Sequence, residues 1–309
     1  MSMRRNYKPL MKKIQAMDYA QYGPHEIRDR LGISTMSLMT DSDPNLGVDR
    51  KALGRAVEAG ARKIEIGADF GPSHFPYQDL EAVKELKKLY DDHGAEIYSI
   101  HSPYGRDPRE WDFDKVTKLV DAMVLVGAKV LLLHFVFVGR QEWEGAMEVM
   151  HRLVRLCEPH DIWLAIETDT DMWFDASFAD WFEFPRVGIC CDTGHTGAYH
   201  GGWNVLESAY NAIYTMSTAN GKLNHLHLSD VSIKPLARPH KTKTLPPRLD
   251  HWSPGLGCSH WGGVMLAVKA MDYPGAFMFE IWTEDEERFE RLAAFPERLA
   301  AGELGKLEG

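Results

Sequence analysis

The chain has 309 residues, of which 44% are hydrophobic and 26% are charged, so it is long and apolar enough to bury one large core. Its 35 basic and 45 acidic residues leave a net charge of −10, which opposes non-specific binding to nucleic acid or anionic lipid. Apolar runs of about ten residues are too short to span a bilayer, and the basic N-terminus lacks the apolar segment of a secretory signal. We therefore expect a soluble cytoplasmic protein that binds a small polar molecule and no membrane.

Short apolar runs alternate with amphipathic segments after an N-terminal arm over residues 1–30, a pattern typical of repeated βα units. Strands are predicted at Gly32–Leu38, Arg62–Gly67, Glu96–His101, Lys129–Phe135, Ile162–Thr168, Val187–Asp192, Leu223–Leu228 and Ala276–Trp282. Helices are predicted at Leu80–His93, Lys115–Val126, Arg140–Cys157, Val205–Met216, Gly262–Met271 and Glu284–Ala301. This alternation favours an α/β fold, a (β/α)8 TIM barrel forming a single domain over residues 1–309, rather than an open doubly wound sheet.

One long segment, Val231–His260, interrupts the alternation after the seventh predicted strand. Its five prolines exclude a helix, and loops of this length in compact domains are usually functional or disordered. It carries basic residues and no acidic residue between Val231 and Leu249: Lys234, Arg238, Lys241, Lys243 and Arg248. We expect this loop to lie over the barrel mouth, where it could bind a phosphate or an acidic sugar, or dock a partner subunit. A solvated charged face is the simpler alternative.

Polar residues recur where the predicted strands end. They are His101, His134, Glu167, Asp192 with His195 three residues later, His225, His227 and Glu280. Any one of these histidines could simply bond a backbone carbonyl. Their repetition at one rim of a barrel is informative, because buried charges are costly unless they are paired or bind a metal. Glu65 also ends a strand, and we expect it to support a ligand or to accept a backbone hydrogen bond.

Four of these residues come from strands five to eight and can converge on one point: Glu167, Asp192, His227 and Glu280. Three carboxylates and one imidazole form a mostly hard donor set, which suits Mn²⁺ first, then Mg²⁺ or Co²⁺, better than a cysteine-rich zinc site does. Zn²⁺ remains an alternative. The pattern does not separate His227 from His225, because residues two apart share one face of a strand.

The strand ends IHSPY, LLH, IET, CCDTGH, HLHLSD and FEIW, with SPGLG before the last strand, resemble the xylose-isomerase-like TIM barrel superfamily, which includes the sugar phosphate isomerase/epimerase family. The resemblance covers about residues 30–300. It implies that Glu167, Asp192, His227 and Glu280 hold one metal ion, with His195 beside it orienting a ligand or contacting substrate. In the similar ketose 3-epimerases the two corresponding glutamates act as paired acid and base, which implies catalytic roles for Glu167 and Glu280. Homo-oligomers are common in this superfamily, so a homo-oligomer is expected.

The residue types suit proton transfer next to a sugar carbonyl. Removing a proton from the adjacent carbon creates an enediolate, whose charge a divalent cation stabilises. We therefore expect a metal-dependent sugar or keto-sugar isomerase or epimerase. Further site residues are assigned to sugar contacts and, for His134, to proton transfer as well: His101, His134, His195, His251 and Trp252, with Lys234 and Arg238 from the basic loop. Trp252, Trp261 and Trp282 could equally fill the core or rim.

Three other functions fit parts of the pattern. A lyase or dehydratase acting on an oxidised sugar or 3-oxo-glycoside would use the same metal and base, with His134 protonating the leaving group. A zinc apurinic-site endonuclease would use a three-metal site with histidines matching His101, His134, His195, His227 and His251, but Leu249 replaces an expected aspartate, and the net charge of −10 opposes binding to nucleic acid. The third is a non-catalytic binding subunit. The similar 3-epimerases also have a Glu and an Arg after strand seven, whereas here Val231, Ser232 and Ile233 follow, which counts against a free ketohexose.

Overall fold

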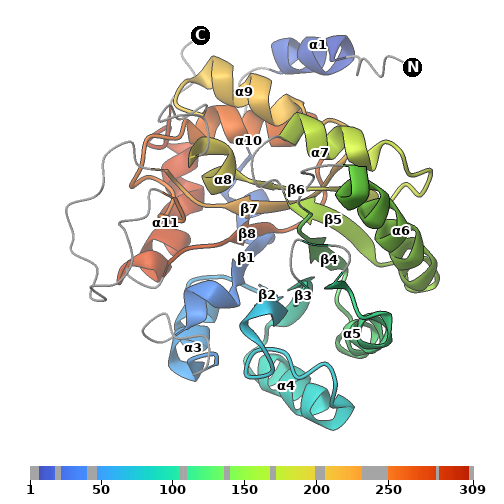
Figure 1. Cartoon of the computed structure of the whole chain (residues 1–309). Coiled ribbons are helices and arrows are strands. Elements are labelled where there is room, and N and C mark those ends of the chain that lie inside the picture. The colour runs from blue at the N-terminus through green and yellow to red at the C-terminus, as the bar shows by residue number, and fades with distance from the viewer. Residues whose placement is uncertain are drawn as a thin grey trace.

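A computed structural model describes residues 7–17, 22–39, 47–104, 107, 110–135, 140–167, 172–198, 206–231, 250–282 and 285–305. Eight parallel strands close into a barrel in chain order, and helices surround them (Figure 1). The strands are β1 Leu31–Ser34, β2 Lys63–Gly67, β3 Glu96–His101, β4 Val130–Leu133, β5 Trp163–Glu167, β6 Val187–Asp192, β7 Leu223–Leu228 and β8 Phe277–Phe279. The predicted TIM barrel is confirmed.

The helices occupy the links between strands, together with the N-terminal and C-terminal segments. They are α1 Lys8–Ala16, α2 Pro24–Arg28, α3 Arg50–Glu58, α4 Leu80–Asp92, α5 Phe113–Val126, α6 Arg140–Cys157, α7 Met172–Ala179, α8 Thr193–Ala198, α9 Ala209–Ser217, α10 Trp261–Ala270 and α11 Arg288–Ala300. Capping residues set several ends: Asp79 accepts hydrogen bonds from the backbone of α4, and Gly127 ends α5 in the left-handed conformation. None of the described helices has the length and apolar character that crossing a bilayer requires.

Several predicted strands are too long, most clearly those that became β1, β4 and β8. β1 stops at Ser34 because the Ser34 side chain accepts a hydrogen bond from the Met36 amide and starts a 3-10 turn over Thr35–Leu38. β8 covers only Phe277–Phe279 of the predicted range Ala276–Trp282. Met36 and Leu38 follow β1, and Ile281 and Trp282 follow β8, so apolar residues lie beyond both strands and composition alone could not show where the backbone turns.

The N-terminal arm contains helices that the sequence analysis did not predict. Leu10 and Ile14 of α1 are buried against Leu266 and Ala270 of α10, a small apolar cluster separate from the main core. Figure 1 shows α1 lying against the outside of the barrel next to α9 and α10. α1 is therefore packed onto the helical layer and lies away from the barrel interior.

Side chains alternate between two apolar layers along each strand. Cys190 points into the barrel with Val130, Leu132 and Ala165, whereas Cys191 packs in the layer between strands and helices. Two residues further along the same inward faces come Glu167 after Ala165 and Asp192 after Cys190. The apolar interior therefore gives way to carboxylates at the carboxyl end of the barrel, where the residues of TIM-barrel active sites lie.

Candidate metal centre and active site

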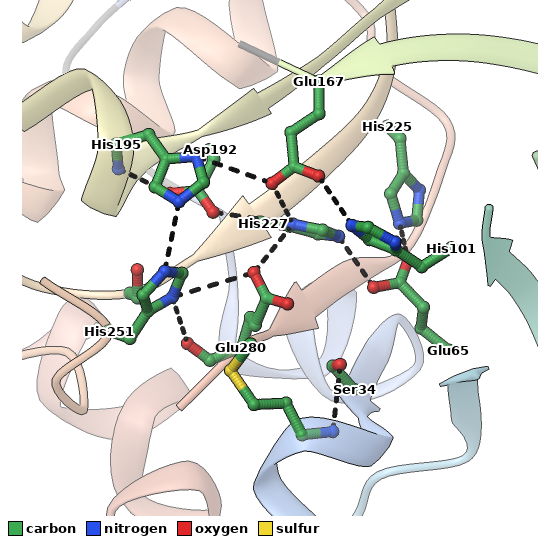
Figure 2. A network of polar contacts seen from close by, with 12 residues as sticks. Ser34, Glu65, His101, Glu167, Asp192, His195, His225, His227, His251 and Glu280 are labelled. Atoms are coloured by element: carbon green, nitrogen blue, oxygen red, sulfur yellow. Dashed lines mark hydrogen bonds and ion pairs between the residues drawn. The ribbon is translucent and has the colours of Figure 1, made fainter. Parts of the chain in front are cut away.

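The four residues predicted to share one metal ion lie together at the carboxyl end of the barrel (Figure 2). The Nδ1 atom of His227 lies 3.1 Å from Glu167 Oε1, 3.5 Å from Asp192 Oδ2 and 3.0 Å from Glu280 Oε2. One ligand atom from each of the four residues lies within 4.8 Å of the others. β5, β6 and β7 supply three of them, and Glu280 directly follows β8.

The burial of this group indicates what it can hold. The side chains of Glu167, Asp192 and Glu280 are 1%, 0% and 6% exposed around one imidazole. A protonated His227 offsets one of the three carboxylate charges, and the remaining charge needs the neighbouring histidines or a cation, because unpaired buried charges are strongly destabilising. Oxygen and imidazole donors of this kind fit a divalent cation, which supplies the missing positive charge.

The pKa values reflect the same crowding of charge. Burial alone would raise the pKa of Glu167, but the charges of His227 and His134 and hydrogen bonds from His101 and His134 hold it well below its usual value. Burial also opposes ionisation of Asp192, yet His195 and His227 lower its pKa. Carboxylates that stay ionised when buried are suited to bind a cation.

His101 and His134 form a pair on the other oxygen of Glu167. Their Nε2 atoms are 2.9 Å apart and lie 3.2 Å and 3.0 Å from Glu167 Oε2. Asp69 Oδ1 lies 3.4 Å from the Nδ1 of His101. Burial would lower the pKa of His101, but Asp69 and Glu167 raise it to about 10. The sequence analysis did not identify Asp69, whose only signal is its position just after β2.

His195 and His251 form a second pair on the opposite side of the group. Their Nε2 atoms are 3.2 Å apart, and the His195 amide donates a 2.8 Å hydrogen bond to Asp192 Oδ1. His251 has a positive φ of 59°, which is unusual for a residue other than glycine. Its Nδ1 lies 3.7 Å from Glu280 Oε2, and its carbonyl accepts from the Trp282 amide. Strained backbone held in place in this way is often found at functional sites.

The two histidines of β7 have different environments. His227 faces the three carboxylates, whereas the Nε2 of His225 lies 3.0 Å from Glu65 Oε2 deeper in the barrel. Burial lowers the pKa of His225, partly offset by Glu65, and so favours the neutral form of this ring. The geometry therefore separates the two residues where the strand pattern could not, and it places His227 at the candidate metal centre.

Other predicted site residues lie less centrally or outside the described part of the chain. Lys234 and Arg238, the basic residues assigned to substrate binding, fall outside the described residues. Trp252 is partly exposed and pairs through its backbone with Asp230. Trp261 is fully buried against Phe295, so this tryptophan fills the core, as one of the two alternatives expected.

Comparison with known proteins supports the fold and the family. The sequence profile of the xylose isomerase-like TIM barrel family matches residues 53–302. A D-tagatose 3-epimerase-like protein has a TM-score of 0.63 at 14% identity, covering 88% of this chain and 97% of its own. A xylose isomerase domain protein from Planctomyces limnophilus has a TM-score of 0.63 at 16% identity, with 92% and 98% covered. The 3-keto-D-glucoside 4-epimerase from E. coli has a TM-score of 0.60 at 14% identity, with 87% and 98% covered. Comparison with curated protein sequences gives no match.

Proposed function

Because the chain belongs to the xylose isomerase-like TIM barrel family, we propose that it is a divalent-metal-dependent sugar or keto-sugar isomerase or epimerase. The observation that carries the proposal is the convergence of three buried carboxylates on the Nδ1 of His227. Structures with the same fold include a D-tagatose 3-epimerase-like protein and a 3-keto-D-glucoside 4-epimerase, which supports a sugar or keto-sugar as the substrate class.

In this proposal Glu167, Asp192, His227 and Glu280 hold one divalent cation, with Mn²⁺ preferred for this donor set. When bound, the cation polarises a substrate carbonyl and stabilises the negative charge that develops on it. The protein must then supply a base beside the carbon that loses its proton.

Glu167 and Glu280 are the proposed acid and base. Glu167 is the last residue of β5 and Glu280 directly follows β8, so the two side chains can face different sides of a bound sugar. Glu167 directs Oε1 at His227 and Oε2 at the His101 and His134 rings. Glu167 is in direct contact with His134, so a His134 ring whose Nε2 carries no hydrogen could receive the proton that Glu167 takes from carbon. Epimerisation uses both glutamates, whereas isomerisation needs only one to return the proton to the neighbouring carbon.

The rim supplies the remaining substrate contacts in the proposal. The side chains of His101 and His195 are 13% and 12% exposed, so both rings are partly accessible and are proposed to contact sugar hydroxyl groups. His251 and Trp252 stand at the start of the segment that returns from the basic loop. Lys234 and Arg238 are proposed to bind a phosphate or a carboxylate if the sugar carries one.

Deuterium exchange tests the proposed reaction class. The Mn²⁺-loaded protein is incubated in D₂O with ketohexoses, 3-keto-glucosides and their phosphates, and the products are followed by NMR. Uptake of deuterium next to the carbonyl without fragmentation is expected. Release of an aglycone or of water would instead identify the lyase or dehydratase alternative. Absence of exchange and of product across the panel would contradict both.

One observation favours a second candidate, a zinc phosphodiesterase of the apurinic-site endonuclease type. His101 and His134 both face Glu167 Oε2, and these three residues form a second group that could hold a cation, as do Asp192, His195 and His251. A site with several cations would suit phosphate ester cleavage. Elemental analysis separates the candidates, since the sugar enzyme is expected to hold one ion per chain and the nuclease three. Cleavage of DNA carrying an abasic site provides the activity test.

A further inference from the structure

A second polar cluster lies deeper in the barrel than the four proposed metal ligands. It consists of Glu65 from β2, Ser99 from β3 and His225 from β7, and all three side chains are fully buried. Figure 2 shows Glu65 reaching toward both His225 and His227 from across the barrel. A buried carboxylate in this position cannot contact a substrate, so its role must be sought in the residues that it touches.

Both oxygens of Glu65 have assigned neighbours. Oε2 accepts a 2.8 Å hydrogen bond from Ser99 Oγ and lies 3.0 Å from His225 Nε2. Oε1 lies 2.9 Å from the Nε2 of His227. Because Ser99 and His225 hold one oxygen in place, the carboxylate cannot rotate freely, and its other oxygen stays directed at His227.

The contact has a consequence for the His227 ring. A neutral imidazole carries one N–H, and a carboxylate can only accept a hydrogen bond. Carboxylates face both nitrogens of the His227 ring, so the hydrogen could lie on either; a cation bound at Nδ1 would leave the hydrogen on Nε2, where Glu65 can accept it. Nδ1 is the atom that lies 3.0 Å from Glu280 and 3.1 Å from Glu167. With the hydrogen on Nε2, the Nδ1 lone pair would be available to a cation held by the three carboxylates.

We propose that Glu65 is a positioning residue that fixes the tautomer and orientation of His227, so that Nδ1 can bind the cation. This inference depends on the metal centre of the proposed function and adds a residue that the four-ligand set does not contain. A carboxylate on the far side of a metal-binding imidazole also makes that imidazole a stronger donor. Ser99 and His225 act indirectly, because they hold the Glu65 carboxylate that contacts His227.

The test compares Mn²⁺ binding by metal-free wild type, Glu65→Gln and Glu96→Gln, measured by titration calorimetry. Gln has the shape of Glu, but it carries no charge, and its amide nitrogen cannot accept a hydrogen bond. We expect Glu65→Gln to bind Mn²⁺ about 10- to 100-fold more weakly. Glu96→Gln makes the same chemical change at the start of β3, where the carboxylate is exposed and pairs with Lys63, and should bind like wild type.

The outcomes separate this inference from the proposed function. If wild type binds no divalent cation, the metal-dependent function itself fails. If wild type binds Mn²⁺ and Glu65→Gln binds it equally well, only the role of Glu65 is refuted. Loss of a second stoichiometric ion in Glu65→Gln would make Glu65 a ligand, since Glu65, His225 and His227 could themselves surround an ion, and would also overturn the positioning role.

A spectroscopic measurement decides the question even if the variant does not fold. The wild-type protein, labelled with ¹⁵N-histidine and loaded with Zn²⁺, reports the tautomer of each ring by NMR. We expect His227 to coordinate through Nδ1 and to carry its hydrogen on Nε2. Coordination through Nε2, or a hydrogen on Nδ1 in the loaded protein, would refute the inference.

Discussion

The Nε2 atom of His101 lies 2.9 Å from the Nε2 atom of His134, and both face the same carboxylate oxygen of Glu167. The other oxygen of Glu167 faces His227. Glu167 therefore connects two groups of side chains: the candidate cation ligands on one side and a pair of imidazoles on the other. Whether that pair carries protons or binds a second cation distinguishes the sugar enzyme from the phosphodiesterase.

Replacing His134 by Ala tests this distinction. If the pair carries protons, the variant keeps the tightly bound ion, while deuterium exchange into the substrate falls about 100-fold or more. Elemental analysis after dialysis and the exchange rate in D₂O measure the two effects on one sample. Loss of one ion per chain from His134→Ala, relative to wild type, would show that the pair binds a cation and would favour the phosphodiesterase.

The two glutamates are expected to be needed for turnover in different ways. In an epimerase, Glu167→Gln and Glu280→Gln should each reduce exchange by about 10²- to 10⁴-fold, because each removes an acid or base as well as a charged ligand. The surface variant Glu96→Gln serves as the matched control. In an isomerase only one glutamate carries the proton, so at saturating Mn²⁺ one variant should retain most of the exchange. Full exchange in both variants would show that neither glutamate acts as an acid or base.

The pKa of His101 predicts how pH affects the cation-free protein. Asp69 and Glu167 raise the pKa of His101 to about 10 in the folded protein, from its ordinary value of 6.5. A raised pKa means that the protonated ring contributes its full stabilisation below about pH 6.5 and loses it as pH rises toward 10. The melting temperature in EDTA should fall across that range, and the fall should be smaller in His101→Gln. Parallel pH curves for wild type and variant would contradict this cause.

The fold and the four proposed ligands were accessible from sequence because both depend on local patterns. Each strand is a short apolar run, and each of these ligands lies at or just beyond the point where such a run stops, so a barrel brings them to one rim. The distinction between His225 and His227 was not accessible. They lie on the same face of one strand, and only their neighbours from other strands separate them.

Asp69 was missed, and the partners of Glu65 could not be predicted, for a related reason. Glu65 contacts His225, which is 160 residues away in sequence, and Ser99, which is 34 residues away. Asp69 reaches His101 from a turn whose course no periodic pattern predicts. Such contacts form only when the barrel closes. Nothing in the sequence of one strand indicates which side chains of a distant strand it will contact.

Asp230, two residues after β7, holds both ends of the long segment that leads to His251. Its side chain is fully buried, and its backbone forms an isolated β-bridge with Trp252, which lies near the far end of that segment. Five donors share its two carboxylate oxygens: the amides of Val231 and Ser259 on Oδ1, and the amides of Gly255 and Gly257 with the Trp261 indole on Oδ2. Five N–H groups directed at one carboxylate require an acceptor at both oxygen positions.

Replacing Asp230 by Asn should therefore destabilise the protein. One acceptor becomes an NH₂ group, so at least two buried N–H groups lose their partner, at about 1–3 kcal/mol each. We expect a loss of about 3 kcal/mol in the free energy of unfolding, measured by urea denaturation, and a lower melting temperature. The matched change Asp272→Asn affects a side chain that is 81% exposed and pairs with Lys13, and should alter stability by less than about 0.5 kcal/mol. Equal stability of the two variants would mean that the segment is held by contacts other than the Asp230 carboxylate.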